Sequence, residues 1–272
     1  MTVSDILVSL AAIGGRKVAV CGAAGYVGRN LLAGAELGRE SVELGALSPD
    51  SFDLFVHLAA RIGEETDFFR YNVSLDARVF SFCRRHGKKL IYASTNNIYP
   101  FAENCDEKAT PMQGQGYYSL SKIAGETLLA ACGPEFAALR IGDVFGAGQK
   151  YGNFFQAIEK AVSGKSPLTL YGQGVKIRSY IHISELARVI RFFLANPDKI
   201  SGQAYNVCFD TPYSVAEIVE AVSAKAGLPV QAVAFEDKPD TRTMKNDLLK
   251  SAGYRFELDM DAALDMYLRS IK

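Results

Sequence analysis

The chain has 272 residues, 49% of them hydrophobic, and its 30 basic and 30 acidic residues give a formal net charge of zero. This composition predicts a soluble globular protein with a large core in one or two domains, and the absence of a basic block excludes nucleic acid as an expected partner. Five scattered cysteines without a Cys-x-x-Cys pair argue against a disulfide framework or a metal site and favour the cytoplasm.

The first apolar stretch, Ile6 to Ile13, follows Asp5 and is too short to cross a bilayer. It lacks the basic leader of a signal peptide, so we expect no membrane association. We interpret residues 3–13 as an additional N-terminal helix.

A glycine-rich turn follows the short apolar strand Lys17 to Cys21. Gly22, Gly25 and Gly28 are spaced three residues apart, and glycine is required where a turn tightens and where backbone approaches a pyrophosphate. The spacing therefore predicts a dinucleotide-binding turn, with the pyrophosphate at the start of a helix from Tyr26 to Leu37. A glycine turn without a ligand is the alternative when the three glycines are considered alone.

Apolar strands then alternate with amphipathic helical stretches, which is typical of a parallel sheet covered on both faces. We therefore predict an α/β fold with a Rossmann-type, doubly wound parallel sheet. Ligands of such sheets bind outside the carboxyl ends of the strands. The further predicted strands are residues 54–60, 89–94 and 136–141.

The strand–helix rhythm ends near Gln149, and residues 234–254 are rich in charges. We predict a dinucleotide-binding domain over residues 1–150, with a segment near 178–205 returning to it. A smaller, mixed C-terminal substrate-binding lobe would then comprise residues 151–177 and 206–272.

A tyrosine and a lysine are spaced four residues apart within a predicted helix from Gly116 to Ala131. This spacing places Tyr118 and Lys122 on one face, where the ammonium is expected to lower the pKa of the phenol and make it an acid–base group. Thr95, at the end of a predicted strand, could bind the same substrate oxygen. The alternative is a surface tyrosine and lysine on an amphipathic helix.

In this order the motifs resemble the extended short-chain dehydrogenase/reductase family, which contains nucleotide-sugar epimerases, dehydratases and 4-ketoreductases. The resemblance runs over nearly the whole chain. Its segments are Gly22–Gly28, Val56–Ala60, Asn72–Val73, Ala93–Tyr99, Tyr118 with Lys122, Arg140–Gly146 and Gly172–His182.

The resemblance implies a nicotinamide cofactor, NAD or NADP, and roles for individual residues. Thr95, Tyr118 and Lys122 would be catalytic, without a metal. The implied cofactor-binding residues are Gly22, Ala24, Gly25, Tyr26, Val27, Gly28, Leu58, Ala59, Ala60, Tyr118 and Lys122. The implied substrate-binding residues are Thr95, Asn96, Asn153 and Arg178. Arg178 would bind a diphosphate bidentately, and an ion pair within the protein is its alternative.

The family also implies a homodimer that pairs the helices over residues 73–86 and 117–132. The same apolar side chains could instead belong to the core of one chain. They are Val79, Phe80, Ile123, Leu128 and Leu129.

The chain departs from the family pattern in three places. Only 24 residues separate Gly28 from Asp53, which is too few for the two strands and the helix that the family has there. The carboxylate that binds the adenosine ribose in the family therefore has no clear counterpart here, and Glu40 and Glu43 are the candidates. The sequence therefore does not distinguish NAD from NADP as the cofactor.

Two of the departures concern the substrate side. Asp143 stands where the family has asparagine, which brings a carboxylate near a substrate phosphate. Asn96 and Asn97 stand where dehydratases have an Asp-Glu pair, and amides cannot perform that acid–base chemistry, so dehydration is disfavoured.

We therefore expect an NAD(P)-dependent oxidoreductase that acts at C4 of a nucleotide-linked sugar. Missing adenosine contacts favour an exchangeable cofactor, and with it a 4-ketoreductase. A nucleotide-sugar 4-epimerase is the alternative, and a non-catalytic dinucleotide sensor is a third reading that leaves Thr95, Tyr118 and Lys122 without a purpose.

Overall fold

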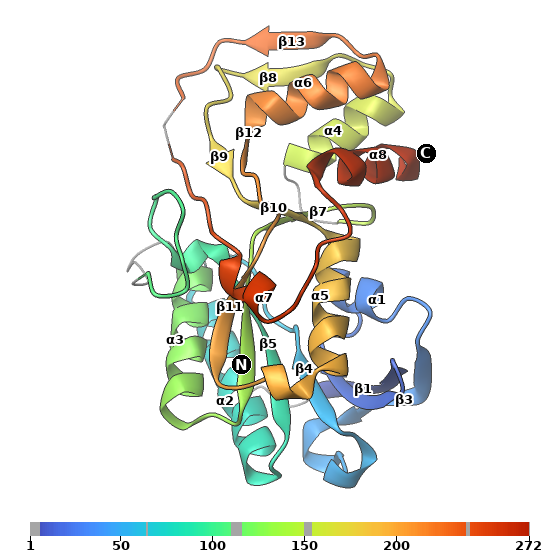
Figure 1. The fold of residues 1–272 in the computed structure, drawn as a ribbon, viewed down its shortest axis with the longest axis vertical. Helices are drawn as coiled ribbons and strands as arrows, with labels where there is room; N and C mark the ends of the chain where they lie inside the picture. Colours follow the sequence, from blue (N-terminus) through green and yellow to red (C-terminus); the bar gives the residue numbers. More distant parts are fainter. Residues whose placement is uncertain (1–5, 64, 110–115, 150–153, 238–239, 272) are drawn as a thin grey trace.

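The computed structural model describes residues 6–63, 65–109, 116–149, 154–237 and 240–271, with side chains for all of these except 37–40. A seven-stranded sheet forms the lower half of the molecule in Figure 1, in the order β11-β6-β5-β4-β2-β1-β3. Its strands are β1 (Leu7–Ile13), β2 (Arg16–Cys21), β3 (Glu36–Glu43), β4 (Leu54–His57), β5 (Lys89–Thr95), β6 (Phe136–Ile141) and β11 (Gln203–Val207).

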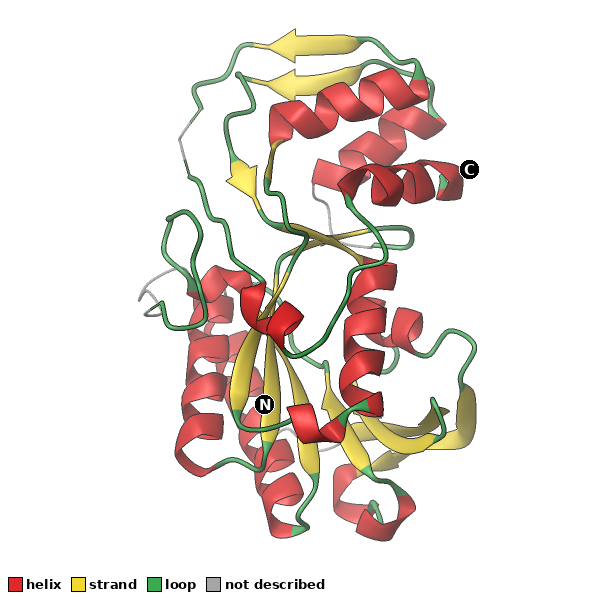
Figure 2. Cartoon of the chain, viewed as in Figure 1, coloured by secondary structure: helices red, strands yellow, loops and turns green. Residues whose placement is uncertain are grey.

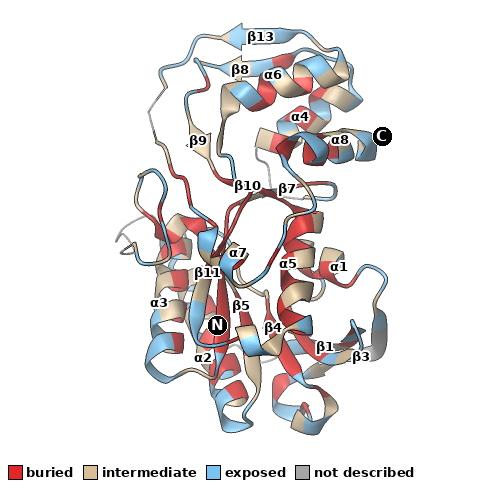
Figure 3. Ribbon diagram, viewed as in Figure 1, coloured by how far each residue is buried: buried red, intermediate tan, exposed pale blue. Residues whose placement is uncertain are grey.

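Five neighbouring strands of this sheet, β11, β6, β5, β4 and β2, are parallel. Every residue of β4 and β6 is buried, because helices cover both faces of the sheet. Figure 3 shows this buried centre in red. The α/β, Rossmann-type fold predicted from the sequence is confirmed.

Helices α2 and α3 pack side by side on one face of the sheet, and α1 and α5 lie on the other, as Figure 2 shows. Buried residues such as Val79 of α2 and Val189 of α5 face the strands. These helices are α1 (Tyr26–Leu31), α2 (Thr66–Arg85), α3 (Tyr117–Cys132) and α5 (Ile183–Ala195), and short 3-10 turns are η1 (Leu44–Ala46), η2 (Pro49–Ser51), η3 (Asn96–Ile98) and η4 (Pro197–Lys199).

The predicted N-terminal helix over residues 3–13 is wrong where the structure describes it, since Leu7–Ile13 is strand β1. Gly14 and Gly15 have φ of +56° and +78°, and two positive φ angles in a two-residue loop make the tight hairpin turn that matches strand twist. β1 therefore folds back antiparallel on β2, with Val8 opposite Cys21.

The helix predicted from Tyr26 to Leu37 is shorter than expected, because α1 ends at Leu31. Gly34 has a φ of +75°, which turns the chain into β3. β3 pairs with β1 and not with β2, so the strand that borders β2 on the side away from β4 is the antiparallel strand β1.

A smaller lobe lies above the sheet in Figure 1. Strands β7 and β10 pair at the junction, and β11 returns to the main sheet beside β6. The proposed domain boundaries stay a prediction. The lobe and junction consist of β7 (Asp143–Phe145), α4 (Phe154–Ser163), β8 (Leu168–Tyr171), β9 (Ile177–Arg178), β10 (Tyr180–His182), β12 (Tyr213–Ser214), α6 (Val215–Ala226), β13 (Val230–Val233) and α8 (Met260–Ser270). The short helix α7 (Asp247–Ser251) lies below the junction, beside β11.

Two histidines have structural positions. His182 caps the start of α5, where its ring accepts a hydrogen bond from the backbone N–H of Ser184 at 3.3 Å. His86 is the exposed C-cap residue of α2. None of the helices in the described part of the chain is both long and apolar enough to cross a membrane.

Candidate functional site

A cavity of about 590 Å³ opens at the carboxyl ends of the parallel strands. Most of the predicted site residues line it together, from the glycine turn to Arg178. Those that do are Gly22, Gly25, Tyr26, Val27, Gly28, Leu58, Ala60, Thr95, Asn96, Tyr118, Lys122 and Arg178. Ala24 and Ala59 do not line it, and Asn153 is outside the described residues.

The glycine turn is packed so closely that two of its positions exclude a side chain. Gly22 has a φ of +92°, and a Cβ there would lie 2.6 Å from the backbone N of Ala59. A Cβ on Gly28 would lie 2.6 Å from the carbonyl oxygen of Ala23. Gly25 has space apart from one contact at 3.2 Å, so its missing side chain leaves room on the cavity side. This turn fits a pyrophosphate.

The adenosine side of a dinucleotide has a different environment. On the side away from β4, β2 is bordered by the antiparallel strand β1. Glu43 of β3 lies opposite Leu7 of β1, two strand spacings and thus about 10 Å from β2. No described residue of β1 or β3 lines the cavity, and the side chain of Glu40 is outside the described residues. The residues present thus fit a pyrophosphate at the glycine turn, without a ribose ligand from the described residues of β1 or β3.

Tyr118 lies in the first turn of α3 and lines the cavity together with Thr95, which stands at the end of β5. Burial, and after it the negative charge of Asp76, raises the pKa of Tyr118 to about 12. The expectation that Lys122 lowers this pKa is therefore wrong for the protein without a ligand. The physical reason lies in where Lys122 points.

Lys122 is 2% exposed, and its Nζ donates to the hydroxyl of Tyr92 at 3.3 Å and lies 4.5 Å from the centre of that ring. The ammonium is thus directed toward β5 and, through Tyr92, toward Asp76. Burial lowers the pKa of Lys122, and Asp76 opposes this effect. Asp76 was not predicted, although a carboxylate among the buried positions of α2, together with Leu75 and Val79, is a signal that the sequence contains.

Thr95 is held by a local turn. Its Oγ1 accepts a hydrogen bond from the backbone N–H of Asn97 at 3.2 Å and so caps η3. Asn96 donates from Nδ2 to Oδ1 of Asp143 at 2.9 Å, which connects the end of β5 to β7. Burial raises the pKa of Asp143, against the opposing hydrogen bond of Asn96 and the charge of Arg178.

Arg178, the predicted diphosphate ligand, makes hydrogen bonds with both the carboxylate and the backbone carbonyl of Asp240. Its Nε lies 3.9 Å from Asp143, and its side chain is 14% exposed. Arg242 contacts the Asn97 side chain and lies 4.8 Å from the ring of Phe101. Arg242 was not predicted, because no local motif distinguishes it within a charged segment.

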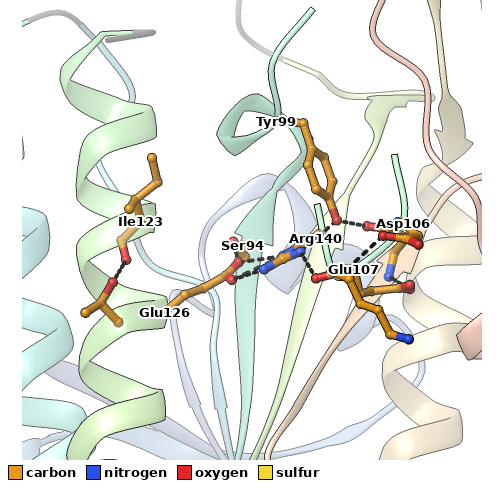
Figure 4. A network of polar contacts seen from close by, with 10 residues as sticks. Ser94, Tyr99, Asp106, Glu107, Ile123, Glu126 and Arg140 are labelled. Atoms are coloured by element: carbon orange, nitrogen blue, oxygen red, sulfur yellow. Dashed lines mark hydrogen bonds and ion pairs between the residues drawn. The ribbon is translucent and has the colours of Figure 1, made fainter. Parts of the chain in front are cut away.

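Below the cavity, a buried ion pair connects α3 to the sheet (Figure 4). Arg140 of β6 donates to Glu126 of α3 at 2.7, 3.1 and 3.2 Å, and Glu126 also accepts from Ser94 of β5. Arg140 further donates to the hydroxyl of Tyr99 at 2.7 Å and to the carbonyl of Glu107 at 2.9 Å. This network fixes the helix that carries Tyr118 against the strand that carries Thr95.

The fold and the site define a Rossmann-type protein with the tyrosine–lysine pair of the extended short-chain dehydrogenase/reductase class. The chain belongs to the NAD dependent epimerase/dehydratase family, whose model matches residues 38–208. The matched range begins after the glycine turn and the short helix α1. Family membership, expected from the motifs, is confirmed.

Curated relatives of this chain are named for reactions of nucleotide-linked sugars. The uncharacterized UDP-glucose epimerase YtcB of Bacillus subtilis is 25% identical over 201 residues, which cover 70% of this chain and 63% of that protein. The dTDP-glucose 4,6-dehydratase of Xanthomonas campestris pv. campestris is 25% identical over 212 residues, 68% of this chain and 59% of that enzyme. The chain thus spans about three fifths of the length of these curated relatives.

A solved structure shows the same fold. The UDP-glucose 4-epimerase of Thermus thermophilus, in complex with NAD, superposes with a TM-score of 0.73 at 22% identity, over 93% of this chain and 98% of that one.

Proposed function

We propose that this protein is an NAD-dependent 4-epimerase of a nucleotide-linked sugar. One observation carries the proposal: Thr95 and Tyr118 line the same cavity as the glycine turn, and amides follow Thr95 at positions 96 and 97. Tyr118 and Thr95 would provide proton transfer at the oxygen of a substrate hydroxyl. The amides remove the acid–base pair that elimination of water would need. The epimerases among the relatives support this choice over reduction.

When bound, the nicotinamide cofactor supplies the acceptor and donor of a hydride. Tyr118 would take the proton of the sugar hydroxyl during oxidation and return it during reduction on the other face of the ring. Thr95 would hold the same oxygen by a hydrogen bond and orient it. Because the pKa of Tyr118 is about 12 in the free protein, Tyr118 is protonated near neutral pH and becomes a base only when positive charge is added beside it.

The far end of the cavity would receive the diphosphate. Arg178 is paired with Asp240, so a diphosphate must replace that carboxylate as the partner of the guanidinium. Lys176, 3.6 Å from Asp240, adds a second positive charge at this end. Asp143 adds a negative one close to Arg178, which weakens the attraction for phosphate.

A second candidate is a 4-ketoreductase that uses NADH or NADPH as a co-substrate. The antiparallel strand β1 beside the glycine turn favours it, because the parallel strand end that normally presents a ribose-binding carboxylate is not there. Each lost hydrogen bond to the adenosine ribose would cost roughly 1–3 kcal/mol, and a weakly held cofactor exchanges. An epimerase must retain its reduced cofactor until the keto intermediate has turned over.

The deciding experiment is to measure the cofactor content of the purified protein and to incubate it with UDP-glucose or dTDP-glucose without added cofactor. Inversion at C4, followed by proton NMR, is the expected result. Activity only on a nucleotide-linked 4-keto sugar with added NADH or NADPH would favour the reductase, and a 4-keto-6-deoxy product would contradict both. The matched control is Tyr118→Phe, which should fold and lose about two to four orders of magnitude in turnover.

A homodimer in the cytoplasm stays a prediction. Val79, Phe80 and Leu129 belong to the core of one chain, whereas Ile123 and Leu128 are only partly buried and could face a second copy. Sedimentation of the protein and of a variant with aspartate at both partly buried positions would test the pairing of α2 and α3.

A further inference from the structure

A chain of three hydrogen bonds runs behind the candidate site. Asp76 of α2 is 1% exposed, its Oδ1 lies 2.8 Å from Nε2 of His57, and its Oδ2 accepts from the hydroxyl of Tyr92 at 2.6 Å. The same hydroxyl accepts from Nζ of Lys122 at 3.3 Å. The carboxylate therefore contacts the cavity lysine through one intervening phenol.

The backbone of α3 leaves space for this chain of contacts at Gly125. A Cβ there would lie 2.7 Å from Oδ2 of Asp76 and 3.0 Å from Cζ of Tyr92. Glycine inside a helix is less stable than alanine by about 1 kcal/mol. The close approach of the phenol and the carboxylate gives a physical reason for glycine at this position.

Several titratable groups surround Lys122, and Asp76 is first among those that favour its charged form. Burial opposes the ionisation of Asp76, but the charge of Lys122, together with the hydrogen bond of His57, outweighs it, so that the pKa of Asp76 is lowered. The groups facing this centre are Cys21 of β2, His57 of β4, Asp76 of α2, Tyr92 of β5, and Tyr118 and Glu126 of α3.

We propose that Asp76 is a positioning residue that favours the charged form of Lys122 and directs its side chain toward Tyr92. The inference rests on the role of Lys122 in the proposed function. Nζ of Lys122 donates to Tyr92, and the negative charge of Asp76 behind it disfavours the phenolate form of Tyr118. Asp76 thereby acts on both members of the acid–base pair, and Tyr118 stays protonated until a ligand adds positive charge.

The direct test is to titrate Lys122 in Asp76→Asn. The protein is labelled with carbon-13 at the ε position of lysine, and the Lys122 signal is assigned by its absence from Lys122→Met. Loss of the negative charge should lower the pH midpoint of Lys122 by about one unit. This measurement needs no turnover, so it can support the inference when the C4 assay fails, and it can overturn the inference when that assay succeeds.

Two variants separate charge from structure. Asp76→Glu keeps the carboxylate and should leave the Lys122 midpoint close to that of the unsubstituted protein. Glu185→Gln removes another fully buried carboxylate, which is bonded to Tyr254 and Arg188 of the protein, and should lower stability without moving the Lys122 midpoint.

Turnover gives the second readout. Removing a negative charge lowers the pKa of Tyr118 as well as that of Lys122, so both limbs of the pH–rate profile of Asp76→Asn should move to lower pH. An unchanged Lys122 midpoint in folded Asp76→Asn overturns the inference. If that variant does not fold, Tyr92→Phe removes only the bridging hydroxyl and should lower the midpoint in the same direction, and no change there is equally decisive.

Discussion

Replacing Arg140 with methionine should destabilise the protein by about 3–5 kcal/mol, the usual cost of removing one partner from a buried ion pair. The side chains of Arg140 and Glu126 are only 8% and 13% exposed. Without the guanidinium, Glu126 retains the Ser94 hydroxyl as its partner in this network, and a partly buried carboxylate loses its counter-charge. The hydroxyl of Tyr99 and the carbonyl of Glu107 each lose a donor as well.

The double variant Arg140→Met with Glu126→Leu removes both charges and leaves none uncompensated. It should lie within about 2 kcal/mol of the unsubstituted protein, so the two substitutions are strongly non-additive. The assay is urea unfolding followed by far-ultraviolet circular dichroism, because the chain has no tryptophan for fluorescence. The reasoning would be refuted if each single variant lost less than about 1 kcal/mol of unfolding free energy and the two losses added up in the double variant. The pair would then behave like a solvated surface pair.

Three further substitutions test other parts of the site and fold. Gly25→Val should abolish the binding of NAD measured by calorimetry, whereas Gly45→Val, where a side chain meets open space, should not. If both variants bound NAD, the pyrophosphate could not lie at the glycine turn. Asp143→Asn should lower KM for a nucleotide sugar by about tenfold, and the gain should grow with pH, because the raised pKa of Asp143 means that its charge appears only at higher pH. A KM that does not depend on pH in either protein would speak against a phosphate near Asp143. Burial lowers the pKa of His182 to about 4, below its unfolded value near 6.5, so its contribution to stability is complete above pH 6.5 and is lost as pH falls toward 4. His182→Asn should make the urea unfolding midpoint depend less on pH between pH 6.5 and pH 4. If the midpoint depends on pH as strongly as in the unsubstituted protein, His182 is not the cause of that dependence.

The sheet could be predicted well because its central strands are buried on both faces and therefore form uninterrupted apolar runs. The predicted strand at residues 136–141 coincides with β6, and the predicted helix from Gly116 to Ala131 differs from α3 by one residue at each end. The N-terminal strand was missed because Leu7–Ile13 is too short for its period to separate helix from strand. The Gly14–Gly15 pair between two apolar runs was the signal that could have identified the hairpin.

The sequence indicates which residues lie close together at the candidate site, but it does not indicate their electrostatics. Tyr118, Thr95 and Lys122 lie in one cavity as expected. The direction of the Tyr118 pKa could not be read, because it depends on Asp76, which lies 42 positions earlier and reaches the site only through helix packing. Likewise, Arg178 meets Asp240, 62 residues further along the chain, a pairing that local spacing does not reveal.

The hairpin of β1 and β2 also affects the order in which the protein can fold. In this sheet the pairing of β2 with β4 joins segments more than 30 residues apart, and that of β6 with β11 joins segments more than 60 apart, so each must close a long loop. The pairing of β1 with β2 closes only the Gly14–Gly15 turn, and hairpins of this kind form within about 1–10 μs. One edge of β2 can therefore be occupied before its parallel partner arrives, which lowers the risk that this apolar strand aggregates during synthesis.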